Sequence, residues 1–204
     1  ERPTSPNLDK LAESGVLFEQ HFTQGLWTSI SVPSYMTGRY FPVLVHDPPR
    51  GTTATIRKPP PGERLISEIM RANGYLTAMI TAHGWFTPKS RLWKSFDETI
   101  FVKPPDPDHP AYAPLEEINK TAFAWLQEHG SQPFFLYMHL LDTHFPHILD
   151  PPYDLWLDPA YTSEKIVNGQ PLAKYGNRFT WADQNHLRGL YDEGILHADA
   201  QVGL

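Results

Sequence analysis

Hydrophobic residues recur along this chain at two spacings, one typical of helices and the other of buried strands. Helical spacing with an apolar face is found at 5–15, 63–72, 115–128 and 181–204. Nearly continuous apolar runs, typical of strands buried on both faces, occur at 75–82 and 133–141. A shorter run at 16–18, followed by Phe22, predicts a further strand.

Local signals mark where several of these elements begin and end. Ser5 and Gly15 predict the two ends of the first helix, and Thr180 predicts the cap of the last one. The segment 41–62 is rich in proline and glycine, which predicts an exposed loop. The segment 148–179 is rich in Pro, Asp and Tyr, and a loop of that length is usually functional or a family insertion.

The order helix, glycine stop and apolar strand occurs twice, at 63–82 and at 115–141. It is the repeating unit of a parallel sheet with helical crossovers. We therefore predict an α/β fold in which a mostly parallel sheet is sandwiched by helices. Functional sites of such folds lie at the carboxyl ends of the strands, and Asp142 and His144 follow the second strand.

The stretch 25–40 holds five serine and threonine side chains. Pro33 suits the first turn of a helix, Thr28 or Ser31 its start, and Gly38 its end. A hydroxyl at a helix N-terminus lies beside unpaired N–H groups and the positive end of the helix dipole, where an anionic ester is well held. Taken alone, such a run is more often a set of helix caps than a nucleophile.

Composition narrows the classes of function. The chain has 204 residues, 40% hydrophobic and 20% charged, which fits one large domain or part of one. The net charge of -6, without a basic stripe, argues against nucleic acid as the main partner. No apolar run approaches the roughly 20 residues that a membrane span needs. The absence of cysteine excludes disulfides and thiolate metal sites and leaves the compartment and the oligomeric state open.

Six blocks of the chain, in order, resemble the sulfatases of the alkaline phosphatase superfamily. Block 5–12 is similar to the family's "TPNLDRLA" opening, 27–40 to its nucleophile segment and 133–146 to its "PFFLYxHxxDxHxPY" block. The other blocks are 74–78, 95–98 and 190–203. The resemblance implies an alkaline-phosphatase-like fold, a small anionic ester as substrate, and hydrolysis of sulfate or phosphate esters by a metal-bound nucleophile.

The resemblance assigns the nucleophile to one of two hydroxyls. In the family it lies nine positions before the threonine of a "TG" pair, and counting back from Thr37 without a gap reaches Thr28. Ser31 is the alternative, because Ser31 and Ser34 mimic the "C/S-x-P-S" formylglycine signature; that register needs three deletions and has Tyr35 in place of its arginine. Threonine cannot form the aldehyde, so Thr28 suits phosphate esters and a matured Ser31 suits sulfate esters. We favour Thr28.

The resemblance also implies residues on the substrate side. His144 matches the histidine of "DxHxP" and would donate to a non-bridging oxygen or protonate the leaving group. In the same block, His139 is a structural or substrate-binding candidate and Asp142 an orienter of the loop or of His144. Arg39 is a further substrate-binding candidate. His83 stands where the family has a lysine–histidine pair and could take over part of that role.

The family also implies a divalent metal ion: calcium or magnesium in one-metal members, zinc in two-metal relatives. Of its ligands we expect only Thr28 in this chain, because the family's aspartate pair and "DHG" ligands match nothing in it. We therefore expect 1–204 to be a single partial hydrolase domain that turns over little by itself. His144 and His147 lack the further cluster that a metal site needs. The alternative function is a non-catalytic relative that binds an anionic glycan or a protein partner.

Overall fold

The computed structural model describes residues 2–44, 62–103, 115–147, 152, 154–167, 169–176 and 178–204. The loop expected at 41–62 falls mostly outside these residues, as does part of the loop expected at 148–179. The chain divides into two compact units, which are described separately. The sheet unit consists of 18–102 and 120–139, and the terminal unit of 1–17, 103–119 and 140–204.

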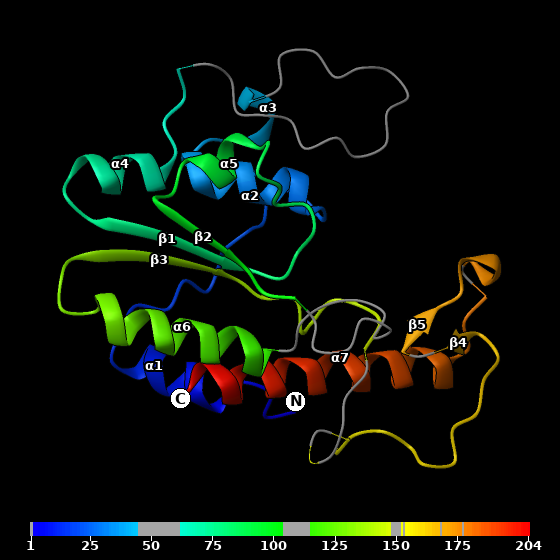
Figure 1. Ribbon diagram of the computed structural model, residues 1–204. Helices are drawn as coiled ribbons and strands as arrows, with labels where there is room; N and C mark the ends of the chain where they lie inside the picture. Colours follow the sequence, from blue (N-terminus) through cyan, green and yellow to red (C-terminus); the bar gives the residue numbers. More distant parts are fainter. Residues whose placement is uncertain are drawn as a thin grey trace. The chain divides into compact units, whose positions relative to one another are not determined.

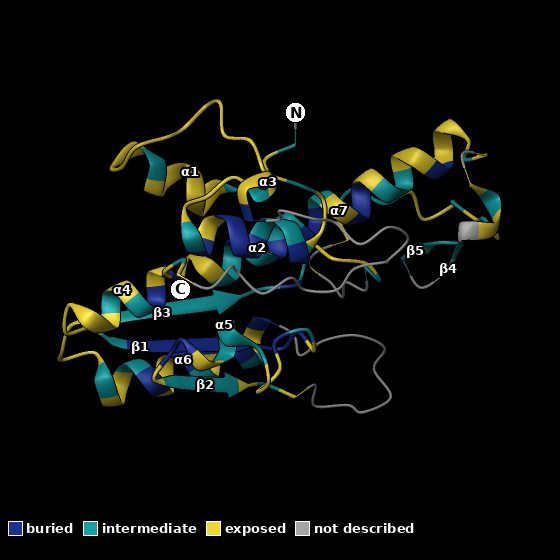
Figure 2. Cartoon of the chain, turned by 90° about the horizontal axis from the view of Figure 1, so that it is seen from above, coloured by how far each residue is buried: buried dark blue, intermediate teal, exposed yellow. Residues whose placement is uncertain are grey.

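The sheet unit is built on three parallel strands. They are β1 (Leu76–Thr81), β2 (Glu98–Phe101) and β3 (Phe134–His139), in the order β2-β1-β3 (Figure 1). Ala78 of the central strand lies opposite Glu98 on one side and Leu136 on the other. β1 is almost wholly buried (Figure 2). The two predicted strands and their parallel arrangement are confirmed, whereas β2 was not predicted. The central position and burial on both faces expected of the strand at 133–141 were wrong: β3 lies at an edge of the described sheet and has no fully buried residue.

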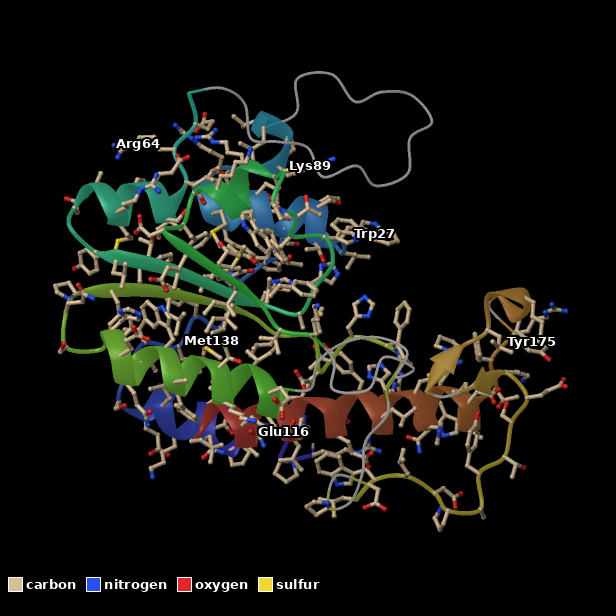
Figure 3. The ribbon with its side chains drawn as sticks, viewed as in Figure 1. Trp27, Arg64, Lys89, Glu116, Met138 and Tyr175 are labelled. Atoms are coloured by element: carbon tan, nitrogen blue, oxygen red, sulfur yellow. The ribbon has the colours of Figure 1, made fainter. Side chains whose placement is uncertain are left out.

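Helices cover both faces of this sheet. On one face lie α2 (Thr28–Thr37), α4 (Ile66–Ala72) and α5 (Arg91–Lys94) (Figure 1). The core on that side consists of Val32, Met36, Leu65, Met79, Phe86 and Phe96. On the other face, where Figure 3 labels Met138, the second half of α6 (Leu115–His129) packs against the strands. There Trp125 donates to Glu98 at 2.7 Å, and its ring contacts Phe134. The predicted sandwich is confirmed.

Helix α2 begins earlier than Pro33 led us to expect. The N–H groups of Ile30 and Ser31 both donate to the carbonyl of Trp27, at 2.9 and 3.0 Å. The helix therefore begins at Thr28, and Pro33 lies inside it rather than in its first turn. The expected position of Pro33 was wrong. The extended backbone of Trp27 places the helix start directly after that residue, and the preference of proline for the first turn of a helix gives no indication of this.

The rest of α2 agrees with its sequence. The hydroxyls of Ser34 and Thr37 donate to carbonyls one turn earlier, those of Ile30 and Pro33, at 2.8 and 2.7 Å. Gly38 ends the helix, as predicted, with a φ of 65° that side-chain-bearing residues rarely adopt. The short helix α3 (Phe41–Leu44) follows.

The strand predicted at 16–18 is not formed. The segment between α1 and α2 contains no strand, and the side chains of Val16, Leu17, Phe18 and Phe22 are 68–79% exposed. An apolar run becomes a strand only where another strand offers backbone partners, and the sheet order gives this segment none within the described residues.

The terminal unit contains α1 (Pro6–Glu13) and the long helix α7 (Trp181–Val202) packed together. It also holds an antiparallel pair, β4 (Ile166–Val167) with β5 (Gln170–Pro171), and a short 3-10 helix, Ala173–Tyr175. The helices agree with the predicted ranges to within a few residues. No helix in the described ranges combines the length and the apolar character needed to cross a membrane.

A distant carboxylate caps α1. Ser5 stands at the predicted cap position, but its hydroxyl bonds to the Asp9 carboxylate instead of a backbone N–H. The N–H groups of Asn7 and Leu8 donate instead to Asp199 of α7, at 2.9 and 2.8 Å. Asp199 is buried, so α1 is joined to α7 by bonds that satisfy the free donors of its first turn.

The start of α7 is capped as predicted and carries a second buried carboxylate. Thr180 accepts from the N–H of Asp183, and Asp183 accepts in return from the N–H and the hydroxyl of Thr180. Lys165, Tyr161 and Ser163 also donate to Asp183, at 2.7–2.8 Å. These donors, Lys165 foremost, hold the pKa of Asp183 well below its usual range. These hydrogen bonds connect the segment 161–165, which precedes the β4–β5 hairpin, to the first turn of α7.

Candidate functional site

Thr28 lies at the N-terminus of α2, as the resemblance requires of a nucleophile. It is the first residue of the helix and is half-buried. Trp27 stands at the cap position and has no side chain that can accept a hydrogen bond. Within the described part of the chain, neither the Thr28 hydroxyl nor the N–H groups of Thr28 and Ser29 have a hydrogen-bond partner. This end of the helix therefore offers open donors and a free hydroxyl to an anion.

Ser31, the alternative nucleophile, is one turn further along the same helix face. Its hydroxyl donates to the carbonyl of Gly25 at 2.7 Å and lies 3.0 Å from the hydroxyl of Thr23. Both contacts fold the segment before the helix back onto it. The Ser31 hydroxyl thus already has structural partners, whereas the Thr28 hydroxyl has none among the described residues.

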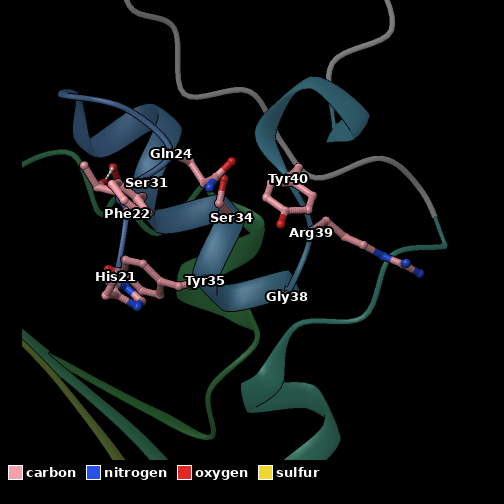
Figure 4. Close-up of a pocket in the computed structure, with 10 residues that line it drawn as sticks. His21, Phe22, Gln24, Ser31, Ser34, Tyr35, Gly38, Arg39 and Tyr40 are labelled. Atoms are coloured by element: carbon pink, nitrogen blue, oxygen red, sulfur yellow. Dashed lines mark hydrogen bonds between the residues drawn. The ribbon is translucent and has the colours of Figure 1, made fainter. Parts of the chain in front are cut away.

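A pocket of about 330 Å³ lies along the side of α2. It is lined by His21, Phe22, Thr23, Gln24, Ser31, Ser34, Tyr35, Gly38, Arg39 and Tyr40. Figure 4 shows Phe22, Tyr35 and Tyr40 around it and Arg39 extending away from Ser31. The Arg39 guanidinium pairs with Glu63 at 3.1 Å. The pocket therefore combines aromatic faces with hydroxyl groups, and Arg39 lies at its rim.

Two of the predicted histidines come together in the sheet unit. His139 is the last residue of β3, and His83 follows the end of β1, with its N–H donating to the Thr81 hydroxyl at 3.0 Å. Their ring centres are 5.4 Å apart. The two strands are parallel neighbours, so their carboxyl ends lie side by side. Burial, followed by the nearby His83, lowers the pKa of His139 to about 4, so His139 is neutral at physiological pH.

Asp142 and His144 occupy a turn in the terminal unit. The N–H of His144 donates to the carbonyl of Leu141 at 2.8 Å, which closes the turn and leaves the His144 side chain exposed. Asp142 is turned inward, where its carboxylate accepts from the N–H of Leu115 at 3.3 Å and lies 3.2 Å from a ring nitrogen of His197. Thr28 and Ser31 belong to the sheet unit, so their expected convergence with His144 stays a prediction.

Comparison with known proteins identifies the family. The family model described as Sulfatase matches residues 1–203. The chain belongs to the sulfatase family. The resemblance inferred from the six sequence blocks is thereby confirmed. No curated protein sequence matches the chain.

Solved structures share the fold of this sulfatase-family chain at low sequence identity. The periplasmic domain of EptC from Escherichia coli, in complex with Zn, is 16% identical with a TM-score of 0.60, over 99% of this chain and 51% of that one. The lipoteichoic acid synthase LtaP from Listeria monocytogenes is 19% identical with a TM-score of 0.62, over 98% and 44%. Ps i-CgsB in complex with k-i-k-neocarrahexaose is 19% identical with a TM-score of 0.60, over 98% and 48%. The chain spans about half the length of each.

The sulfatase-family chain has a hydrogen-bonded row that the sequence did not reveal. The hydroxyl of Tyr35, on α2, bonds to that of Tyr137, on β3, and the Tyr137 hydroxyl lies 2.7 Å from Nδ1 of His139. Burial raises the pKa of Tyr137, so its phenol stays protonated. The alternation of side chains along β3 places Tyr137 and His139 on one face. Nothing in the local sequence joins them to Tyr35, which stands where the formylglycine signature has arginine.

The described residues of this sulfatase-family chain do not by themselves fit a divalent metal. Among them, no group of three or more His, Asp or Glu side chains is placed to hold an ion. Resident metal sites generally need at least three protein ligands. Thr28 offers one oxygen, so it is at most one ligand of a larger set.

Proposed function

We propose that the protein containing this chain is a sulfatase-like hydrolase of sulfuric or phosphoric esters, with the Thr28 hydroxyl as its nucleophile. The observation that carries the proposal is the position of Thr28 at an uncapped helix start, where its hydroxyl and the neighbouring N–H groups have no partner among the described residues. Such an end stabilises the negative charge that gathers on the ester's oxygens during transfer.

The same geometry favours phosphate esters over sulfate esters. A threonine cannot mature to formylglycine, and the Ser31 hydroxyl already bonds to Gly25 and contacts Thr23. In the proposed reaction the Thr28 hydroxyl loses its proton to solvent, and its oxygen forms a bond to phosphorus while the bond to the alcohol oxygen breaks. His144 then gives a proton to the departing alcohol, and water releases the phosphoryl group in a second step. The structural neighbour LtaP is named a synthase, which supports an alcohol acceptor in place of water as a variant of the second step.

The remaining predicted residues take supporting roles. The aromatic faces of Phe22, Tyr35 and Tyr40 would receive the alcohol part of the ester. Arg39, which follows the C-terminal end of α2 and pairs with Glu63, would contact the part of the substrate farthest from Thr28. His139, neutral and half-buried beside His83, would act as a structural support for this end of the sheet.

A divalent ion is part of the proposal. The family is metal-dependent by resemblance, and the neighbour EptC was solved in complex with Zn. Calcium, magnesium and zinc all remain candidates. Thr28 is the ligand that this chain would contribute, and the other ligands are proposed to come from residues outside 1–204, which makes 1–204 part of a larger catalytic domain.

Turnover by paired variants tests the nucleophile. The complete native protein would be assayed with an aryl phosphate, an aryl phosphodiester and an aryl sulfate. We expect Thr28→Ala to lower kcat by about 10³-fold or more on a phosphate substrate, since loss of a nucleophile is among the costliest changes in an enzyme. Ser31→Ala is the matched control and should stay within about 10-fold.

Two results would contradict the Thr28 assignment. One is full activity of Thr28→Ala together with loss of activity in Ser31→Ala. The other is a native Ser31 whose mass is lower by two hydrogen atoms, because that indicates formylglycine and a true sulfatase.

The alternative is a non-catalytic relative that binds an anionic glycan or a protein partner. Two sequence departures favour it: His83 replaces the family's lysine–histidine pair, and Tyr35 stands at the signature's arginine. Under this alternative, the native protein would turn over none of the three esters and would still bind a sulfated glycan.

A further inference from the structure

Within the terminal unit, one histidine connects the turn that carries His144 to helix α7. His197 lies in α7 with its side chain 10% exposed. Its Nε2 is 2.7 Å from a carboxylate oxygen of Glu116, and its Nδ1 is 3.2 Å from Oδ1 of Asp142. Figure 3 labels Glu116 where α6 begins, beside α7. Both ring nitrogens therefore lie within 3.2 Å of a carboxylate oxygen. Two acids this close favour an imidazolium, which carries a proton on each nitrogen.

The charge state agrees with this geometry. Asp142, and after it Glu116, raise the pKa of His197 to about 9 against the cost of burial. His197 is thus a cation at neutral pH. The carboxylates that face it come from α6 and from the turn after β3.

A second contact holds the same turn. Gly194 lies one turn before His197 on the same face of α7. A Cβ at Gly194 would lie 3.0 Å from the carbonyl oxygen of Asp142 and 3.7 Å from Cα of Thr143. At Gly194, where α7 has no side chain, the helix therefore packs directly against the backbone of the turn. One turn later, His197 contacts the carboxylate of Asp142.

The turn has little freedom left between these contacts. Oδ1 of Asp142 serves both His197 and the N–H of Leu115, and the Leu141 carbonyl accepts from the N–H of His144. Asp142 and Thr143 are the two central residues of that turn. The contacts hold the side chain of Asp142 and the backbone of Thr143. They therefore fix the direction in which the exposed side chain of His144 projects from the turn.

We propose that His197 is a positioning residue for His144: it holds Asp142 in place, and the Asp142–Thr143 turn in turn presents His144 to the ester. The inference rests on the proposed function, because it concerns the residue assigned to protonate the leaving group. His197 itself touches neither the ester nor the reacting atoms. Its role differs from that of a helix-packing residue in its dependence on charge and in acting through Asp142.

Steady-state kinetics of the complete native protein with an aryl phosphate provides the first test. We expect His197→Ala to lower kcat about 10- to 100-fold, the scale of a small misplacement of a reacting group. KM should change by less than about 3-fold, because the lost interaction does not bind substrate. Asp142→Asn should behave likewise. His197→Gln, whose amide can donate to both carboxylates, should recover part of the lost kcat.

Glu116→Gln is the matched control. It neutralises the other partner of the same ring and leaves the contact between His197 and Asp142 in place. At neutral pH its kcat should remain within about 3-fold of wild type. The alkaline limb of its pH profile should move to lower pH, because one of the two carboxylates that raise the pKa of His197 is gone. A histidine that only packs between helices would not shift this limb.

Amide hydrogen exchange separates the failure of this inference from the failure of the proposed function. In His197→Ala, the N–H of His144 should exchange at least about 10-fold faster than in wild type, while Met79 in β1 is unchanged. A folded His197→Ala with wild-type kcat and wild-type exchange at His144 would overturn the inference. If wild type turns over no ester, the proposed function fails, and if His144→Ala keeps full activity, the role of His144 as proton donor fails. In either case the exchange at His144 still decides whether His197 holds the turn. His197→Gln gives the same comparison if His197→Ala does not fold.

Discussion

Asp199 joins the two ends of the terminal unit through a set of backbone bonds. It lies in the last turns of α7 and accepts from the N–H groups of Asn7 and Leu8, residues 192 and 191 positions away. Its side chain is 1% exposed, so without this carboxylate the two N–H groups would have no water molecule to donate to. The carboxylate therefore does for α1 what a cap residue usually does from the preceding position.

Replacing Asp199 tests this capping. We expect Asp199→Ala to lower the free energy of unfolding by about 1–3 kcal/mol, because it leaves buried N–H groups without acceptors. Urea denaturation followed by circular dichroism measures the change. Asp192→Ala is the control on the same helix: Asp192 pairs with Arg2 at a partly exposed site and should cost at most about 1 kcal/mol. Equal losses in the two variants would contradict the capping role.

The contacts that the sequence could predict are those whose partners are neighbours in the chain. Thr180 caps α7 through a residue three positions ahead, and that pattern is visible in the sequence. The contacts of Asp142 with His197, of Asp199 with α1 and of Tyr35 with Tyr137 each join residues far apart in the sequence. Local spacing gives no signal for such pairs, so the side chains of the candidate site were predicted by type and not by partner.

At the scale of elements, α2 shows how a helix end depends on one backbone angle. Gly38 ends the helix with φ at 65°, and nothing lies within 4 Å of the place where a Cβ would be added. Gly38→Ala would therefore meet no steric clash, and any loss would come from the left-handed backbone alone.

We expect Gly38→Ala to destabilise the sheet unit by about 1 kcal/mol, the usual cost of this backbone conformation for an alanine. Gly38→Asn should cost less, since asparagine tolerates the left-handed region best among residues with side chains. Thermal unfolding of the three proteins gives the order. An alanine variant as stable as wild type would show that the helix end relaxes without cost.

The elements themselves were predictable to different degrees, for reasons of length and pairing. β1 and β3 are six-residue strands with continuous apolar character, and both were predicted. β2 is only four residues long and was missed. The run at 16–18 has the composition of a strand and no partner strand within the described ranges, so it was predicted wrongly. Apolar composition indicates burial, and strand formation also requires a neighbouring backbone.

At the scale of the whole molecule, metal binding tests whether residues 1–204 can form the metal site without further ligands. The described residues hold no group of three possible ligands. We expect the isolated 204-residue chain to bind calcium, magnesium or zinc no more tightly than about millimolar, because a single oxygen ligand cannot hold a divalent ion. Equilibrium dialysis measures this. Stoichiometric binding at micromolar concentration would refute it and would point to ligands within 1–204.

Two histidines, one in each unit, should make stability respond to pH in opposite directions. In the sheet unit, the pKa of His139 is lowered from 6.5 to about 4, mainly by burial, so between these values the unfolded chain binds a proton that the folded one does not. Stability must therefore fall as pH drops from 6.5 to 4. In the terminal unit, Asp142 and Glu116 raise the pKa of His197 from 6.5 to about 9. The folded form binds the extra proton there, so stability is complete below pH 6.5 and falls as pH rises toward 9.

We therefore expect stability to be greatest near pH 6.5, with His197 dominating the alkaline limb and His139 contributing to the acid limb together with His147 and His186, whose pKa values burial also lowers. Urea unfolding of wild type, His139→Gln and His197→Gln across this range measures both limbs. His139→Gln should flatten the acid limb, by about 1–3 kcal/mol over the full range, and leave the alkaline limb unchanged. His197→Gln should do the reverse, because its charge-dependent contact is replaced by one that does not titrate. If one variant flattened both limbs, the two histidines would not be titrating independently.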